Sequence, residues 1–189
     1  MSRLLEMSLI PRSTWYDNVR SRVSRHKWNA IRAYSVKPSC QYCGHKGRLF
    51  THEVWKYDDK LRIQKLAGFE SVCSLCHAIK HLGLAGLMAK RGDHDYAQLI
   101  KHYCEVNGCS EEDFVQDRKE AFELWQERSS HGWTVDISYL DSLKLPRRVS
   151  NYQAKKGEVR EWMKTHPSEV QRIKNSYSDV LACRSHTIV

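Results

Sequence analysis

The sequence predicts an α+β fold that is mostly helical and is organised around a short β-hairpin. Three observations lead to this expectation. Two Cys-x-x-Cys pairs lie within the stretch 40–81, apolar residues alternate with polar ones in residues 48–56 and 61–66, and helical periodicity recurs on both sides of this stretch. A chain of 189 residues is long enough to bury a hydrophobic core of its own.

Local patterns place each element in turn. Ser13 can cap the first helix, Pro38 stops the chain from continuing it, and Gly83 is a C-cap for the helix that carries the last two paired cysteines. The predicted elements, in order, are a helix at 15–34, strands at 48–56 and 61–66 around a turn at 56–60, a helix at 73–82, helices at 96–106 and 111–125, and a strand at 133–139.

We expect four segments along the chain. Residues 1–37 form a basic helical arm, and residues 38–92 form the core that contains the paired cysteines. Residues 93–143 supply supporting helices and a short strand, and residues 144–189 form a basic linker followed by C-terminal helices.

Basic residues exceed acidic ones, with 31 Lys and Arg against 22 Asp and Glu, so the formal net charge is +9. Such an excess favours a polyanionic partner. Positive charge is concentrated in residues 1–37 and 144–160, whereas acidic residues gather between residues 105 and 127. We therefore predict that nucleic acid is bound by the basic segments, through Arg20, Arg22, Arg25, Arg147 and Arg148.

Four of the seven cysteines form the two Cys-x-x-Cys pairs and are predicted to bind a structural zinc. Zinc takes four ligands in a tetrahedron, and each pair supplies two thiolates. Gly44 follows the second cysteine, where the turn of a zinc knuckle favours a residue without a Cβ atom. Nearby histidines and the lack of a secretory signal favour metal binding over disulfides. The predicted ligands are Cys40, Cys43, Cys73 and Cys76.

Three histidines and a glutamate predict a second site beside the zinc. His77 and His81 are four residues apart and share one face of their helix, whereas His52 and Glu53 lie on the first strand. Imidazole and carboxylate ligands with open positions suit a divalent ion that activates water or binds a phosphate oxygen. Histidine is also the side chain best suited to act as a general base near neutral pH. Together with the basic flanks, these residues indicate cleavage of a phosphodiester.

Four motifs follow one another in the central stretch: Cys-x-x-Cys-Gly, His52-Glu53-Val54-Trp55, Tyr57-Asp58-Asp59, and Val72-Cys73-Ser-Leu-Cys76-His77-Ala-Ile-Lys80-His81. In this order they resemble the HNH endonucleases. They are most similar to the bacterial and phage branch, which carries a His-Glu-Val-Trp motif and a Cys-x-x-Cys-His-x-x-Lys-His helix. The resemblance says little about residues 145–189.

The resemblance implies a ββα-metal fold, in which two strands and a helix surround one catalytic divalent ion. It implies that His52 is the general base, that His77 binds the metal, and that His81 is a further ligand or a phosphate contact. Lys80 would contact the backbone of the cut strand. The implied function is metal-dependent hydrolysis of DNA, by nicking or cutting a duplex. The implied cofactors are a structural Zn²⁺ and an active-site ion, which is Mg²⁺, Mn²⁺, Ni²⁺ or Zn²⁺.

Two departures from the family pattern leave residue roles open. Thr51 stands where the family places an acidic residue or a histidine, and the acid follows the histidine as Glu53. In one register His52 is the base, and in the other His52 binds the metal and Glu53 is the base. The asparagine that orients the base in the family is missing before the third cysteine, and Glu70 or Asp58 is the candidate replacement.

A second interpretation is an inactive zinc-stabilised HNH-like module that binds DNA or a partner protein, and a third is a phage-encoded inhibitor with an acidic helix near residues 111–127. The sequence leaves open whether the chain forms a homodimer. We expect a cytoplasmic location, because no apolar run approaches the roughly 18 residues of a membrane helix and the N-terminus does not read as a secretory signal.

Overall fold

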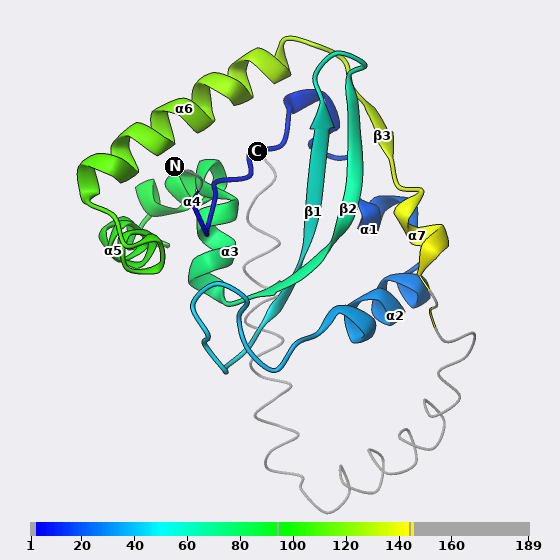
Figure 1. The fold of residues 1–189 in the computed structure, drawn as a ribbon, viewed down its shortest axis with the longest axis horizontal. Coiled ribbons are helices and arrows are strands. Elements are labelled where there is room, and N and C mark those ends of the chain that lie inside the picture. The colour runs from blue at the N-terminus through cyan, green and yellow to red at the C-terminus, as the bar shows by residue number, and fades with distance from the viewer. Residues whose placement is uncertain (1–2, 94, 144, 146–189) are drawn as a thin grey trace, which may run out of the picture. The chain divides into compact units, whose positions relative to one another are not determined.

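The centre of the fold is a β-hairpin made of β1 (Phe50–Asp58) and β2 (Ile63–Val72) (Figure 1). A short strand, β3 (Thr134–Asp136), pairs in parallel with β2 and completes a sheet in the order β1-β2-β3. The structure is a computed structural model that describes residues 3–93, 95–143 and 145. Helices and this sheet occur together within these residues, so the predicted α+β class is confirmed.

The register of the hairpin decides which side chains share a face. His52 on β1 pairs with Glu70 on β2, so these two side chains are neighbours across the strands. Further along, the pairing passes from Val54 with Gly68 to Trp55 with Leu66, which leaves Ala67 as an extra residue on β2. This bulge shifts the alternation of side chains along β2, so that residues on its two sides with the same parity point to opposite faces of the sheet. Leu66 therefore packs in one hydrophobic cluster of the sheet and Val72 in another.

Two helices continue directly from β2. The first is α3 (Ser74–Lys80), and α4 (Leu82–Lys90) follows after a break at His81, whose φ is −106° and ψ is 41°. The prediction that Gly83 ends the helix is wrong, because Gly83 lies inside α4. Leu82 and Ala85 are buried there, so packing carries the helix past the glycine despite its low helix propensity.

Among its described residues, the basic arm contains three short helices, and the last two divide the range of the single helix predicted at 15–34. They are η1 (Arg12–Thr14), α1 (Val19–Arg22) and α2 (Arg25–Ser35). Asn18 and Ser24 each accept a hydrogen bond from a backbone N–H of the helix that follows. Each cap starts a new helix, which explains why residues whose apolar spacing fits one helix belong to two separate helices here.

The remaining helices support α3. Helix α5 (Tyr96–Asn107) packs against α3, and α6 (Glu111–Ser129) packs against α5 (Figure 1). Tyr103 and Phe114 meet edge to face with ring centroids 5.2 Å apart, within the same core as α3. Gly108 ends α5 with a φ of 59°, as expected for a glycine C-cap.

The predicted strand 133–139 is present as the shorter β3, and the last described element, α7 (Tyr139–Ser142), begins at its final residue. The predicted linker and C-terminal helices of residues 144–189, with Arg147 and Arg148, lie outside the described residues except for Leu145. Among the helices that the structure describes, none has the length and apolar character needed to cross a membrane.

Candidate metal centres

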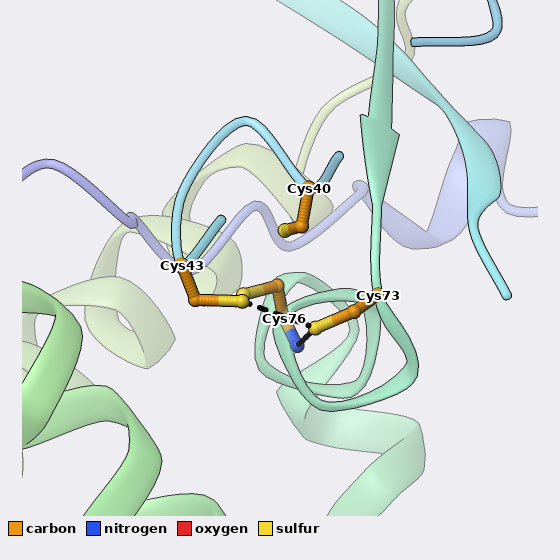
Figure 2. A group of neighbouring side chains, drawn as sticks. All are labelled: Cys40, Cys43, Cys73 and Cys76. Carbon is orange, nitrogen blue, oxygen red and sulfur yellow. Dashed lines mark hydrogen bonds between the residues drawn. The ribbon is translucent and has the colours of Figure 1, made fainter. Parts of the chain in front are cut away.

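The four paired cysteines come together where β2 ends and α3 begins. Figure 2 shows their side chains turned toward one another from the loop before β1 and from α3. Their sulfur atoms all lie within 4.8 Å of one another, and the Sγ atoms of Cys43 and Cys73 are 3.5 Å apart. This separation excludes a disulfide, which needs about 2.05 Å. It fits tetrahedral zinc, because Zn–S bonds of about 2.3 Å place the sulfurs roughly 3.8 Å apart.

Backbone geometry shapes both halves of this thiol cluster. Cys40 accepts a hydrogen bond from Gly44 N–H through its carbonyl, at 3.0 Å, and its own N–H donates to the His45 carbonyl, at 2.8 Å. Gly44 has a φ of 73°, which a residue with a Cβ atom adopts only with strain. On the other side, Cys73 caps α3, because its Sγ accepts a hydrogen bond from Cys76 N–H at 3.5 Å.

The electrostatics of the thiol cluster favour a bound cation. Burial and the neighbouring Cys73 and Cys40 raise the pKa of Cys76, and burial also raises the pKa of Cys43. Burial opposes ionisation of Cys40 as well, but backbone N–H groups outweigh it and lower the pKa to about 7. Four thiolates in this space repel one another unless a positive ion compensates their charge. The four predicted ligands are therefore compatible with a structural zinc.

His102 on α5 was not among the predicted site residues. Its Nε2 atom lies 3.2 Å from Cys76 Sγ, at a distance suited to an N–H donor to a thiolate. Its 26-residue separation from Cys76 leaves no local spacing signal, so sequence patterns do not reveal the contact. Contacts of this kind orient a metal ligand and stabilise its charge.

We expect His102→Ala to lower the zinc affinity by about 10–100-fold, which is typical of losing a hydrogen bond to a metal ligand. The measurement is competition with a zinc chelator at equilibrium. His26→Ala is the control, since His26 is exposed on α2. Equal zinc affinities for the two variants would contradict this role for His102.

Three histidines form a second group near the thiol cluster. His52 comes from β1, His77 from α3, and His81 from the break between α3 and α4. One ring nitrogen of each lies within 4.8 Å of one ring nitrogen of the others. The ring centroid of His52 lies 5.5 Å from that of His77 and 4.9 Å from that of His81. Three imidazoles at this spacing suit a divalent ion and leave coordination positions open.

The surroundings of His77 and His81 favour the neutral form of both side chains. Burial, and secondly the nearby His52, lower the pKa of His77 to about 4 and the pKa of His81 to about 3. Neutral imidazole is the form that binds metal ions. The predicted pair at positions 77 and 81 is therefore brought together in a form that can act as ligands.

His52 is surrounded by a buried polar network. Its side chain is 6% exposed, and its Nδ1 atom lies 3.2 Å from Glu70 Oε1. The two atoms form no standard hydrogen bond, so the contact is electrostatic. Lys80 Nζ also lies 3.2 Å from Glu70 Oε1, and the Tyr42 hydroxyl donates a hydrogen bond to Glu70 Oε2. Of the two candidate partners for His52, Glu70 is thus the one beside it.

The charge of Glu70 is maintained by these neighbours. Burial alone would raise the pKa of its carboxyl group, but His52, Tyr42 and the ammonium group of Lys80 outweigh burial and lower the pKa to about 2. Glu70 therefore carries a negative charge beside His52 Nδ1. In the neutral ring, a carboxylate in this position favours the tautomer that carries its proton on Nδ1.

The prediction that Lys80 contacts DNA does not fit the structure. Its side chain is buried, with 7% of the residue exposed, and its ammonium group lies 4.6 Å from the centre of the Tyr42 ring. Tyr42 belongs to the first Cys-x-x-Cys pair, so Lys80 and Glu70 link the thiol cluster to His52. A charge held this way stabilises the interior and does not reach a phosphate at the surface.

Glu53 does not join the three imidazoles. Its carboxylate accepts hydrogen bonds from Val19 N–H at 3.0 Å and from the indole N–H of Trp55 at 3.2 Å, and burial raises its pKa. Neighbouring residues on a strand point to opposite faces, which explains the separation from His52. Both still line one pocket of about 360 Å³, because β1 is the edge strand of the sheet.

The predicted arginine contacts of the arm differ in their surroundings. Arg20 is exposed and lines the same pocket as His52, and Arg25 is exposed at the start of α2. Arg22 forms a bidentate ion pair with Asp17 and donates a hydrogen bond to the Val135 carbonyl at 3.3 Å. The guanidinium of Arg22 therefore already binds partners within the protein itself.

Comparisons of the chain with protein-family models, with curated proteins and with solved structures gave no match. The arguments about function therefore depend on the residues and their geometry.

Proposed function

We propose that the protein is a metal-dependent HNH-type endonuclease that hydrolyses phosphodiester bonds in DNA. The observation that carries this proposal is the group of three imidazoles at a pocket, with His52 on β1, His77 on α3 and His81 at the end of α3, around a hairpin that leads directly into this helix. A strand-strand-helix order around one ion is what the resemblance of the sequence implies. The helix that presents His77 also presents Cys76 to the thiol cluster, so one element holds both centres.

In this proposal, His77 and His81 hold the divalent ion and His52 is the general base. A bound ion would polarise a phosphate oxygen and stabilise the negative charge that develops on it. Glu70 orients the His52 ring through Nδ1, which leaves Nε2 to accept the proton of the attacking water. The two hydrogen bonds that occupy Glu53 favour this assignment over the one in which Glu53 is the base.

The test is incubation of supercoiled plasmid with zinc-loaded protein in Mg²⁺, Mn²⁺, Ni²⁺ or EDTA. We expect metal-dependent nicking, and a fall of at least about 100-fold in His52→Ala, which is typical for removal of a general base. His26→Ala is the matched control, because it removes an exposed imidazole from α2. Nicking by His52→Ala at the unaltered rate would overturn the assignment.

A second candidate function is DNA binding without hydrolysis. The observation that favours it is that the group of three imidazoles, as found among the described residues, contains no carboxylate ligand. The same plasmid assay separates the two functions. Plasmid that stays intact in every metal, but is retarded in a gel at low salt, would support the binding module.

A further inference from the structure

The pocket beside the three imidazoles has an unusual lining for a site that handles only phosphate. It has a volume of about 360 Å³ and combines three indole rings with an arginine, an amide and a carboxylate, namely Trp15, Trp28, Trp55, Arg20, Asn18 and Glu53. The histidines at positions 52, 77 and 81 line the same pocket. Its volume is at the lower end of the roughly 300–1,000 Å³ of small-ligand sites.

The three tryptophans reach this pocket from separate elements. Trp15 follows η1, Trp28 lies on α2 and Trp55 lies on β1. Trp28 also packs edge to face on Phe69, with centroids 6.3 Å apart, and the Trp55 indole donates to Glu53, so these two rings are held in place. Trp15, in contrast, is 43% exposed. A large indole that is left open to solvent beside a pocket is available to a ligand with a flat apolar face.

A nucleobase is such a ligand. Aromatic side chains bind bases by stacking, and every base offers a face for this contact, so recognition does not depend on sequence. A base inside a duplex has both faces covered by its neighbours and must be unstacked before it can enter a pocket of this kind. Arg20 is exposed at the pocket and supplies a positive charge for the phosphate attached to such a base.

We propose that this pocket binds an unpaired base of DNA next to the phosphate that the imidazole site acts on. The substrate class is therefore DNA with an unpaired nucleotide, as in a single strand, a bulge or a mismatch. This inference rests on the proposed function, because it takes the imidazole group as the place of the reacting phosphate. Trp15 provides the stacking surface and Arg20 the phosphate contact.

The test measures binding separately from cleavage. Zinc-loaded protein without added divalent ion is titrated with a fluorescent oligothymidine and, in parallel, with a fully paired duplex of the same length. We expect tighter binding of the unpaired strand, and a loss of about 10-fold for that strand in Trp15→Ala, which is the scale of one stacking contact. Tyr16→Ala is the matched control, since Tyr16 is the adjacent residue and is 87% exposed.

Two further variants keep the result interpretable. Trp15→Phe retains an aromatic face and is expected to recover most of the affinity, which a general loss of folding would not allow. Arg20→Gln is expected to weaken binding and to reduce its dependence on salt, because one phosphate contact is removed. Equal affinity for the paired duplex, or equal effects of Trp15→Ala and Tyr16→Ala, would overturn the proposal.

Cleavage assays then separate this inference from the proposed function. Binding of unpaired DNA that depends on Trp15, without cleavage in any metal, would support the pocket and contradict the endonuclease. Cleavage that depends on His52, with the same rate on a bulged and a fully paired duplex and no effect of Trp15→Ala, would support the endonuclease and contradict the pocket.

Discussion

Replacement of Cys76 by serine is expected to destabilise the fold severely. Cys76 is fully buried, and its sulfur belongs to the thiol cluster that joins the loop before β1 to α3. Structural zinc supplies about 10–16 kcal/mol of apparent binding free energy in small zinc domains, and this free energy is coupled to folding. Loss of one thiolate and of most of the zinc affinity should therefore lower the free energy of unfolding by at least about 5 kcal/mol.

Thermal unfolding measures this effect. A chain of this length loses roughly 2–4 °C of melting temperature per kcal/mol, so we expect a fall of more than about 10 °C for Cys76→Ser. Zinc removal from the unaltered protein with a strong chelator should give a similar fall. Cys104→Ser is the matched control, because Cys104 is a free thiol on α5 outside the thiol cluster. An unaltered melting temperature after complete zinc removal would rule out a structural zinc.

Loss of Glu70 should have the second largest effect, because it leaves a buried charge without a partner. In Glu70→Leu, the ammonium group of Lys80 stays inside the protein with its carboxylate removed. Breaking a buried ion pair in this way costs about 3–5 kcal/mol. We also expect nicking to fall by about 10–100-fold, because His52 loses the carboxylate that orients it.

A double variant separates the two roles of Glu70. In Glu70→Leu/Lys80→Met both buried charges are replaced by apolar groups, so most of the lost stability should return. Nicking should stay low, since His52 still lacks its carboxylate. Lys65→Met is the control on the same strand, because its ion pair with Asp136 is exposed and worth about 0–1 kcal/mol. Recovery of nicking together with stability would show that Glu70 acts only through the fold.

The parts of the site that depend on local spacing can be predicted from the sequence. Two Cys-x-x-Cys pairs identify the four thiols, and the four-residue spacing of His77 and His81 brings their rings together, although α3 itself ends at Lys80. Glu53 is predicted in the same site as His52, but the alternation of side chains along β1 turns the two to opposite faces, and the group of imidazoles does not include Glu53. In each case the relevant geometry is set by residues that are close along the chain.

The long-range contacts could not be predicted, because they depend on how distant elements pack. Glu70 meets His52 through the hairpin register, and Lys80 meets Glu70 across the join between sheet and helix. Tyr42 reaches the same carboxylate from the first cysteine pair, and His102 reaches Cys76 from α5. The resemblance assigns Lys80 to the DNA backbone, and only the folded structure brings Lys80 to its carboxylate partner, Glu70.

Helix ends were also missed, once where local caps outweigh the apolar period and once where packing outweighs a glycine. The caps at Asn18 and Ser24 divide an apolar period that continues across them. Gly83 lies within α4, because the buried Leu82 and Ala85 on either side keep the helix packed. The bulge at Ala67 has no signature in the apolar pattern, and β2 continues past it to Val72, well beyond the predicted strand.

The proposed roles of the three imidazoles can be separated by titrating Mn²⁺ into zinc-loaded protein and assaying nicking in the same samples. We expect one further ion to bind per chain of the unaltered protein. His77→Ala should lose both this ion and nicking, whereas His52→Ala should retain the ion and lose nicking. Absence of a second bound ion, or nicking that survives in His77→Ala, would contradict a metal-dependent endonuclease centred on these histidines.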